Sequence, residues 1–188
     1  MKYLLFVLVY LSLCNVAFSY EKHEVRMSLT DIFYVEETDN WKVEIQREMP
    51  IRLADVKVTP KNNHDFSMML YFKCDTKDLS KFDTPEEISN SIKLSNEQYL
   101  PYTIEKEIKL FEIPIKSTYG YYCTFTDSKL ANKEKLDKGE YKFITRGMYR
   151  VSRDAVLGFS IMSNDISSNE YNKLIAYVYS FFKQQTSR

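Results

Sequence analysis

The last long segment of the chain, residues 167–183, has the pattern of an amphipathic helix with a broad aromatic face. Its apolar residues recur every three or four positions, which places them on one side of an α-helix: Tyr171, Leu174, Ile175, Val178, Phe181 and Phe182. Ser167 and Glu170 have the spacing of a capping box, in which each side chain bonds to the other residue's backbone amide. Because such a helix needs a large apolar partner, we expect it to cover a β-sheet.

The segments before this helix alternate apolar and polar residues with the period of β-strands. Strand patterns run through residues 41–45, 51–59, 66–74, 103–116, 118–126, 141–145, 148–151 and 155–163. A change of apolar phase near Ala54 predicts a bulge, and residues 84–87 (TPEE) have the composition of a helix start. We therefore predict an α+β fold, a mostly antiparallel sheet covered by helices, with Trp41 as a core anchor.

The N-terminus is typical of a secretory signal peptide. Lys2 precedes an apolar run over residues 3–13, and the small residues Ala17 and Ser19 stand where a signal peptidase would cut before Tyr20. The run is shorter than the roughly 20 apolar residues of a spanning helix. We predict a signal peptide at 1–19 and a single domain at 20–188, exported to the periplasm or outside the cell.

Two further observations bear on localisation. Cys14 raises the alternative of a lipoprotein signal, but Leu13 before it is bulkier than such sites prefer. Removal of 19 residues leaves 169, with 25 basic and 26 acidic side chains. This balance gives no long-range attraction for nucleic acid or an anionic membrane. We therefore expect no nucleic-acid partner and no stable membrane insertion after cleavage.

The two cysteines of the mature chain, Cys74 and Cys123, are an even count in an exported protein, which favours a disulfide. Each shares a strand face with aromatic residues, so both sulfurs point towards apolar layers. A bridge would close a loop of about 50 residues and stabilise by about 4 kcal/mol. The alternative is two buried free thiols.

Residue types that carry catalysis are sparse. His23 and His64 lie in segments predicted to be an arm and a turn, and neither belongs to a metalloprotease motif or a nucleophile elbow. The four glycines of the chain do not form a phosphate-binding loop. We therefore predict no metal site and no cofactor.

Carboxylates leave one enzymatic alternative open. Glu36–Glu37 and Glu86–Glu87 are adjacent acidic pairs, and the second is explained by a helix start. Asp127 and Asp165 end predicted strands, where turn capping accounts for them. A hydrolase acting through two facing carboxylates outside the cytoplasm is the alternative to a non-catalytic protein.

Three segments of the second half, GYYCTFTD at 120–127, GEYKFITRG at 139–147 and LGFSIMSND at 157–165, resemble an uncharacterised group of exported bacterial proteins. The absence of Asn-x-Ser/Thr glycosylation sites is also consistent with a bacterial source. The order of elements is similar to the PsbP-like fold, an antiparallel sheet covered by helices. The resemblance implies a binding or assembly accessory protein rather than an enzyme, and it brings no catalytic residues with it.

The chain holds 15 tyrosines and 12 phenylalanines, which favours a protein-binding surface. Tyr99, Tyr102, Tyr119 and Tyr122 lie near predicted loops or on outward strand faces and are the candidate binding residues. We expect an exported, non-catalytic accessory or binding protein whose partner is another envelope protein or a host component.

Overall fold

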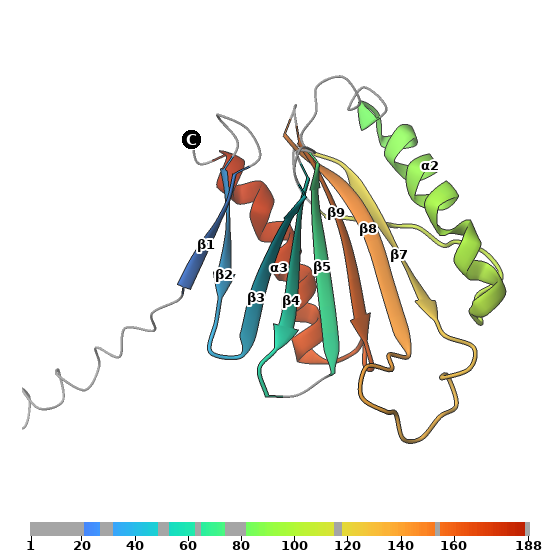
Figure 1. Cartoon of the computed structure of the whole chain (residues 1–188). Helices are drawn as coiled ribbons and strands as arrows, with labels where there is room; N and C mark the ends of the chain where they lie inside the picture. The colour runs from blue at the N-terminus through green and yellow to red at the C-terminus, as the bar shows by residue number, and fades with distance from the viewer. Residues whose placement is uncertain are drawn as a thin grey trace, which may run out of the picture.

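Seven strands form one antiparallel sheet in the order β3-β4-β5-β9-β8-β7-β6, and helices lie against it (Figure 1). The structure, a computed structural model, describes residues 21–26, 32–48, 53–62, 65–73, 82–114, 118–152 and 155–186. The sheet strands are β3 (Trp41–Glu48), β4 (Leu53–Pro60), β5 (Phe66–Lys73), β6 (Phe111–Glu112), β7 (Gly120–Thr126), β8 (Phe143–Ser152) and β9 (Ala155–Ser163). A separate hairpin pairs β1 (Glu21–Arg26) with β2 (Ile32–Glu37). The helices are α2 (Pro85–Asn96), the 3₁₀ helix η2 (Glu97–Tyr102) and α3 (Asn169–Thr186). This arrangement confirms the predicted α+β class.

The last strand of the chain occupies the middle of the sheet. β9 pairs with β5 on one side and with β8 on the other. The N-terminal meander β3-β4-β5 and the C-terminal meander β6-β7-β8 therefore join only through β9. In Figure 1 the early strands stand on one side of it and the later strands on the other.

One face of the sheet packs against α3 and the β1–β2 hairpin. Alternate residues of β3, β4, β5, β8 and β9 point to this side because side chains alternate along a strand. The large buried side chains of these strands include Trp41, Phe72, Tyr149 and Phe159, and Phe33 of β2 joins them in the same core. Trp41 is 7% exposed and packs edge-on against Tyr177 of α3, with ring centroids 5.4 Å apart. The prediction of Trp41 as a core anchor is confirmed.

The closing helix covers the sheet as its spacing predicts. Tyr171, Leu174 and Val178 are buried, whereas the side chains of Phe181 and Phe182 lie outside the described residues. Two buried hydroxyls fix the helix on β8. Tyr149 donates to the Val178 carbonyl at 2.6 Å, and the hydroxyls of Tyr171 and Thr145 lie 2.7 Å apart.

The predicted capping box of this helix is wrong. Ser168, not Ser167, accepts a hydrogen bond from the first turn, from the amide of Tyr171 at 3.1 Å. Ser167 instead bonds to the Asp165 carboxylate. Glu170 accepts a hydrogen bond from the Trp41 indole at 2.6 Å. The Glu170 carboxylate, which the sequence spacing predicted to cap the helix, therefore accepts a hydrogen bond from a distant strand instead.

The opposite face of the sheet is covered by α2 over part of its width. Ile88 and Ile92 of α2 pack on Cys123 and Phe125 of β7 in a second, smaller core. The sequence signature of this helix is confirmed, since Thr84 and Glu87 form a complete capping box with Pro85 in the first turn.

Other strand predictions need correction. Residues 21–26, expected to be a loose arm, form β1, because β2 supplies a complete antiparallel partner. Residues 103–116 hold only the two-residue strand β6 among those described. The strands predicted at 141–145 and 148–151 are parts of the single strand β8, which begins at Phe143. The bulge expected near Ala54 does not occur, since Ala54 pairs in continuous register with Arg47 and Phe72.

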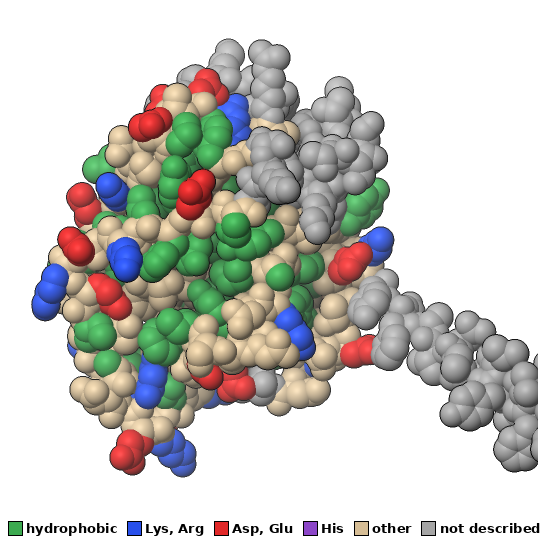
Figure 2. All heavy atoms as spheres, turned by 180° about the vertical axis from the view of Figure 1, so that it is seen from behind, with side chains coloured by type: hydrophobic (Ala, Val, Ile, Leu, Met, Phe, Trp, Pro, Cys, Tyr) green, Lys and Arg blue, Asp and Glu red, His purple; other side chains and the backbone are tan. Residues whose placement is uncertain are grey.

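From behind the view of Figure 1, hydrophobic side chains gather across the middle of the molecule and many charged ones lie towards its margin (Figure 2). In the ranges that the structure describes, no helix is long and apolar enough to cross a bilayer. The predicted signal peptide lies outside the described residues.

Candidate functional site

The segment leading into α2 is fastened to the sheet by Arg150 of β8. The Arg150 guanidinium forms an ion pair of 2.7 Å with Asp83 and donates to the Phe82 carbonyl at 2.8 Å. The Tyr119 hydroxyl donates to the carbonyls of both Phe82 and Asp83, and burial raises its pKa. Tyr119, predicted as a binding residue, is therefore engaged in holding the helix start.

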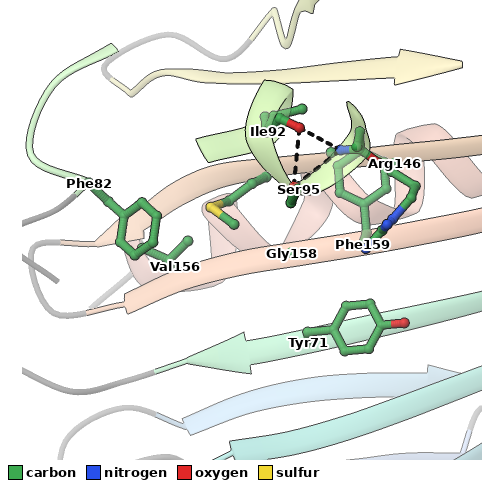
Figure 3. Close-up of a pocket in the computed structure, with 11 residues that line it drawn as sticks. Tyr71, Phe82, Ile92, Ser95, Arg146, Val156, Gly158 and Phe159 are labelled. Carbon is green, nitrogen blue, oxygen red and sulfur yellow. Dashed lines mark hydrogen bonds between the residues drawn. The ribbon is translucent and has the colours of Figure 1, made fainter. Parts of the chain in front are cut away.

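Because α2 lies over β7 and β8, a groove remains where the helix borders β9 and β5. We call it the α2 groove and define it by Tyr71, Phe82, Asn96, Arg146, Val156 and Gly158. It encloses a cavity of about 240 Å³. Figure 3 shows Phe82 and Val156 towards one end, Ser95 and Arg146 towards the other, and Tyr71 on the neighbouring strand β5.

Arg146 projects from β8 into this layer between the sheet and the helix. Its guanidinium lies over the ring of Tyr99, 4.9 Å from the centroid. Nη1 is buried and has no hydrogen-bond acceptor among the residues that the structure describes. Within the described part of the chain, no carboxylate forms an ion pair with Arg146. This cation is held by packing rather than by a charge partner.

Asn96 closes the last turn of α2 above the same groove and is 2% exposed. Its Nδ2 donates to the Ile92 carbonyl at 2.7 Å, which fixes the orientation of the amide. Oδ1 is then a buried acceptor without a donor. The α2 groove thus contains an unpaired donor and an unpaired acceptor.

A second depression, of about 380 Å³, lies beside η2. Tyr99, Tyr102 and Tyr141 line it. Tyr102 is 65% exposed, and Ile104, two positions further along the chain, is 53% exposed. We call Tyr99, Tyr102, Ile104 and Tyr141 the η2 surface. Two of the four predicted tyrosines, Tyr99 and Tyr102, therefore share one surface.

Tyr122 lies on the other side of the sheet. A Cβ atom built on Gly147 of β8 would meet both the Tyr122 side chain and the Phe159 ring, which belongs to the α3-side core. The ring of Tyr122 stacks on Phe111 of β6, with centroids 5.4 Å apart. The four tyrosines therefore do not form one patch.

The predicted Cys74–Cys123 bridge is not present at its Cys123 end, where the thiol is free and buried. Cys74 lies outside the described residues. Burial raises the pKa of the Cys123 thiol to about 12.

The candidate carboxylates serve structural roles. Asp127 accepts from the amides of Lys129 and Leu130, Asp165 accepts from Ser167, and Glu37 accepts from Val43 and pairs with Lys61 at 2.8 Å. These interactions, led by hydrogen bonds from Ser167 and Lys61 respectively, lower the pKa of Asp165 and Glu37. A general acid needs a raised pKa.

Of the two histidines, the structure describes His23. His23 is not in a loose arm but in β1, half-buried, with Nε2 3.6 Å from the Glu37 carboxylate. His64 lies outside the described residues. Among the residues that the structure describes, no group of three His, Cys, Asp or Glu side chains could hold a metal ion.

The seven-stranded antiparallel sheet with helices on its two faces is the PsbP-like fold that the sequence resemblance implied. The chain is similar to the solution structure of cyanobacterial PsbP (CyanoP) from Synechocystis sp. PCC 6803, with a TM-score of 0.51 and 10% sequence identity over 89% of this chain and 94% of that chain. At this identity the likeness concerns the fold alone. No family model matches the sequence, and no curated protein matches it.

Sequence reasoning missed Arg146 and Asn96. Arg146 stood in an assumed break between two strands, so no face was assigned to it. Once β8 is continuous, Arg146 falls between Ile144 and Met148 on the α2 side of the sheet. A cation inside an apolar alternation was the available signal.

Proposed function

We propose that the chain is an exported accessory protein that binds another protein, of the cell envelope or of a host, without a catalytic centre of its own. Residues 1–19 would act as the signal peptide and residues 20–188 as the single mature domain. The fold supports this proposal through the accessory role that the PsbP-like resemblance implies. Fold alone does not identify a partner. The exposed apolar side chains of the protein indicate where a partner would bind.

The exposure of Tyr102 carries the proposal. A tyrosine that is 65% exposed, beside an isoleucine that is 53% exposed, contributes apolar area that the fold itself does not use. Tyrosine is enriched in protein interfaces because its ring packs while its hydroxyl stays solvated. The depression of about 380 Å³ beside it could receive a side chain of the partner. We assign the η2 surface as the contact region.

The carboxylate hydrolase gains no support from the described residues. Asp127 and Glu140 both line the depression at the η2 surface, but each is occupied. Asp127 caps its own turn, and Glu140 binds the Lys133 ammonium at 2.5 Å. The Lys133 hydrogen bond lowers the pKa of Glu140. Glu140 therefore lacks the environment of a proton donor.

Site-specific cross-linking tests the contact region. A photoreactive phenylalanine analogue at position 102 should cross-link one reproducible protein in cells of the native host. The same analogue at Tyr34 of β2, 37% exposed, is the control. Tyr102→Ser should then weaken binding to that purified partner at least ten-fold, and Tyr34→Ser should leave it unchanged. Equal cross-linking from both positions would contradict the assignment.

Export has its own test. The protein recovered from the native host should begin at Tyr20 when its N-terminus is sequenced by mass spectrometry. A retained Met1 on cytoplasmic protein would overturn the export proposal. A lipid-modified N-terminus at Cys14 would overturn the cleavage site and restore the lipoprotein alternative.

A further inference from the structure

We propose that the α2 groove binds a small amphipathic carboxylate, of the class of medium-chain fatty acids. The carboxylate would pair with the Arg146 guanidinium, and the alkyl chain would lie along the apolar part of the groove. The site adjoins the η2 surface through the contact between Arg146 and Tyr99, but it does not depend on a protein partner.

The state of Arg146 carries the proposal. A guanidinium keeps its charge in proteins, so Arg146 cannot relieve its burial by losing a proton. Nη1 is removed from water and has no acceptor. The Tyr99 ring offsets the charge from one side only, at 4.9 Å. A carboxylate supplies the two acceptor oxygens in a plane that the guanidinium fork matches.

Asn96 is a second, independent indication. Its side chain is 2% exposed, lines the same cavity and leaves Oδ1 without a donor. Buried amide oxygens are almost always satisfied in folded proteins. A bound water would complete it, because the carboxylate of the ligand has no proton to donate. A groove used only for packing would have no reason to keep two unmatched polar groups.

The other lining residues indicate that the uncharged part of the ligand is a hydrocarbon chain. Phe82, Ile92 and Val156 present hydrocarbon to the cavity. Its volume of about 240 Å³ is below the roughly 300–1,000 Å³ of sites for drug-sized ligands. The α2 groove offers one cation and a short apolar lining. It therefore suits a singly charged, unbranched acid better than a polyanion or a peptide.

Gly158 of β9 keeps the floor of the groove open. A Cβ atom built there would come no closer than 3.7 Å to Tyr71, an ordinary van der Waals contact. The strand therefore tolerates a side chain at this position, and that side chain would extend into the groove. Gly158→Leu is accordingly a steric block that leaves Arg146 in place.

Octanoate is the probe, titrated into the full chain and followed by calorimetry and by amide chemical shifts. We expect saturable one-to-one binding, with shifts at Arg146, Gly158 and the end of α2. Octylamine and octan-1-ol should bind at least ten-fold more weakly than octanoate. Absence of saturation at millimolar octanoate would overturn the proposal, as would shifts centred on the α3 side of the sheet.

Three variants test the assignment. Arg146→Gln should weaken octanoate binding at least ten-fold, and Gly158→Leu should abolish it. Lys42→Gln removes the same charge from an exposed ion pair with Glu44 on β3 and should leave the affinity unchanged. Circular dichroism establishes whether each variant folds. If Arg146→Gln does not fold, Gly158→Leu still tests the site. Equal affinities in wild type and Gly158→Leu would overturn the site, whatever the outcome of cross-linking at Tyr102.

Discussion

The indole Nε1 of Trp41 donates a hydrogen bond of 2.6 Å to the carboxylate of Glu170, which joins the start of β3 to the first turn of α3 across 129 positions of sequence. The Tyr177 ring packs edge-on against the same indole. The Tyr177 hydroxyl, in turn, accepts from the backbone amide of Glu36 at 2.7 Å. Trp41 thus links the sheet, the closing helix and the β1–β2 hairpin at one point.

Removal of the Glu170 carboxylate should measurably destabilise the protein. Glu170→Ala leaves the indole N–H of a nearly buried tryptophan without an acceptor, so we expect a loss of about 1–3 kcal/mol in the free energy of unfolding. Lys173→Ala is the matched control, because it removes only an exposed ion pair of 3.7 Å with the same Glu170. That control should change stability by less than about 0.5 kcal/mol. Urea unfolding of both variants decides the matter, and equal losses would contradict the role given to the indole.

Two glycines of the sheet should respond oppositely to the same substitution. A Cβ on Gly120 would lie 2.2 Å from the Tyr149 Cβ, whereas the nearest atom to a Cβ on Gly158 is 3.7 Å away. Gly120→Ala should therefore cost about 1–3 kcal/mol through overpacking. Gly158→Ala should be neutral or stabilising by up to about 1 kcal/mol, because alanine restricts the unfolded chain. Thermal unfolding of the two variants measures the difference in stability. Similar unfolding midpoints would show that β7 and β8 do not approach each other as closely as the 2.2 Å contact implies.

The Cys123 thiol should be inert in the folded protein. Burial raises its pKa to about 12, so roughly one thiol in ten thousand is ionised at pH 8, at ten-fold per pH unit. The thiolate is the form that alkylating agents attack. Iodoacetamide at pH 8 should therefore leave Cys123 unmodified in the native state and modify it fully in guanidinium, as peptide mass spectrometry would show. Rapid native labelling would refute its burial.

Stability should fall steeply at alkaline pH. Burial raises the pKa of Tyr149, Tyr171 and Tyr177 above the ordinary value near 10. The folded protein therefore retains protons that the unfolded chain has lost. By linkage, the stabilisation is complete below about pH 10 and is lost as pH rises beyond it. Tyrosinate absorbance at 295 nm should rise in a cooperative step that coincides with loss of circular dichroism. Smooth titration of every tyrosine near pH 10, with the fold intact, would contradict this.

Periodicity in the sequence was sufficient for the central elements and insufficient at their margins. Tyr171, Leu174 and Val178 predicted the face of α3, and the alternation around Trp41 predicted β3, because both elements bury one clear stripe. The segment at 103–116 misled because Ile113 is buried in the core while Ile104 is exposed, and only Phe111 and Glu112 of the described residues pair as a strand. Glu170 misled in another way, since local spacing contains no information about an indole 129 residues away.

The candidate site was less accessible to sequence reasoning than the fold. Tyrosine content pointed to Tyr99 and Tyr102, which do share a surface. It also pointed to Tyr119 and Tyr122, whose surroundings depend on sheet order and on the position of α2. Arg146 becomes a candidate binding residue only because packing of the chain buries part of its guanidinium. Such burial depends on contacts between distant segments, which the periodicity of the sequence does not indicate.

The position of β9 has a consequence for how the protein is made. Before residue 155 leaves the ribosome, the early and late meanders have no shared strand, and the α3-side face of each lacks its helix. Long-range pairings of this kind form late, because the ends of a long loop must first be brought together. The topology therefore delays completion of the core until β9 and α3 have been synthesised.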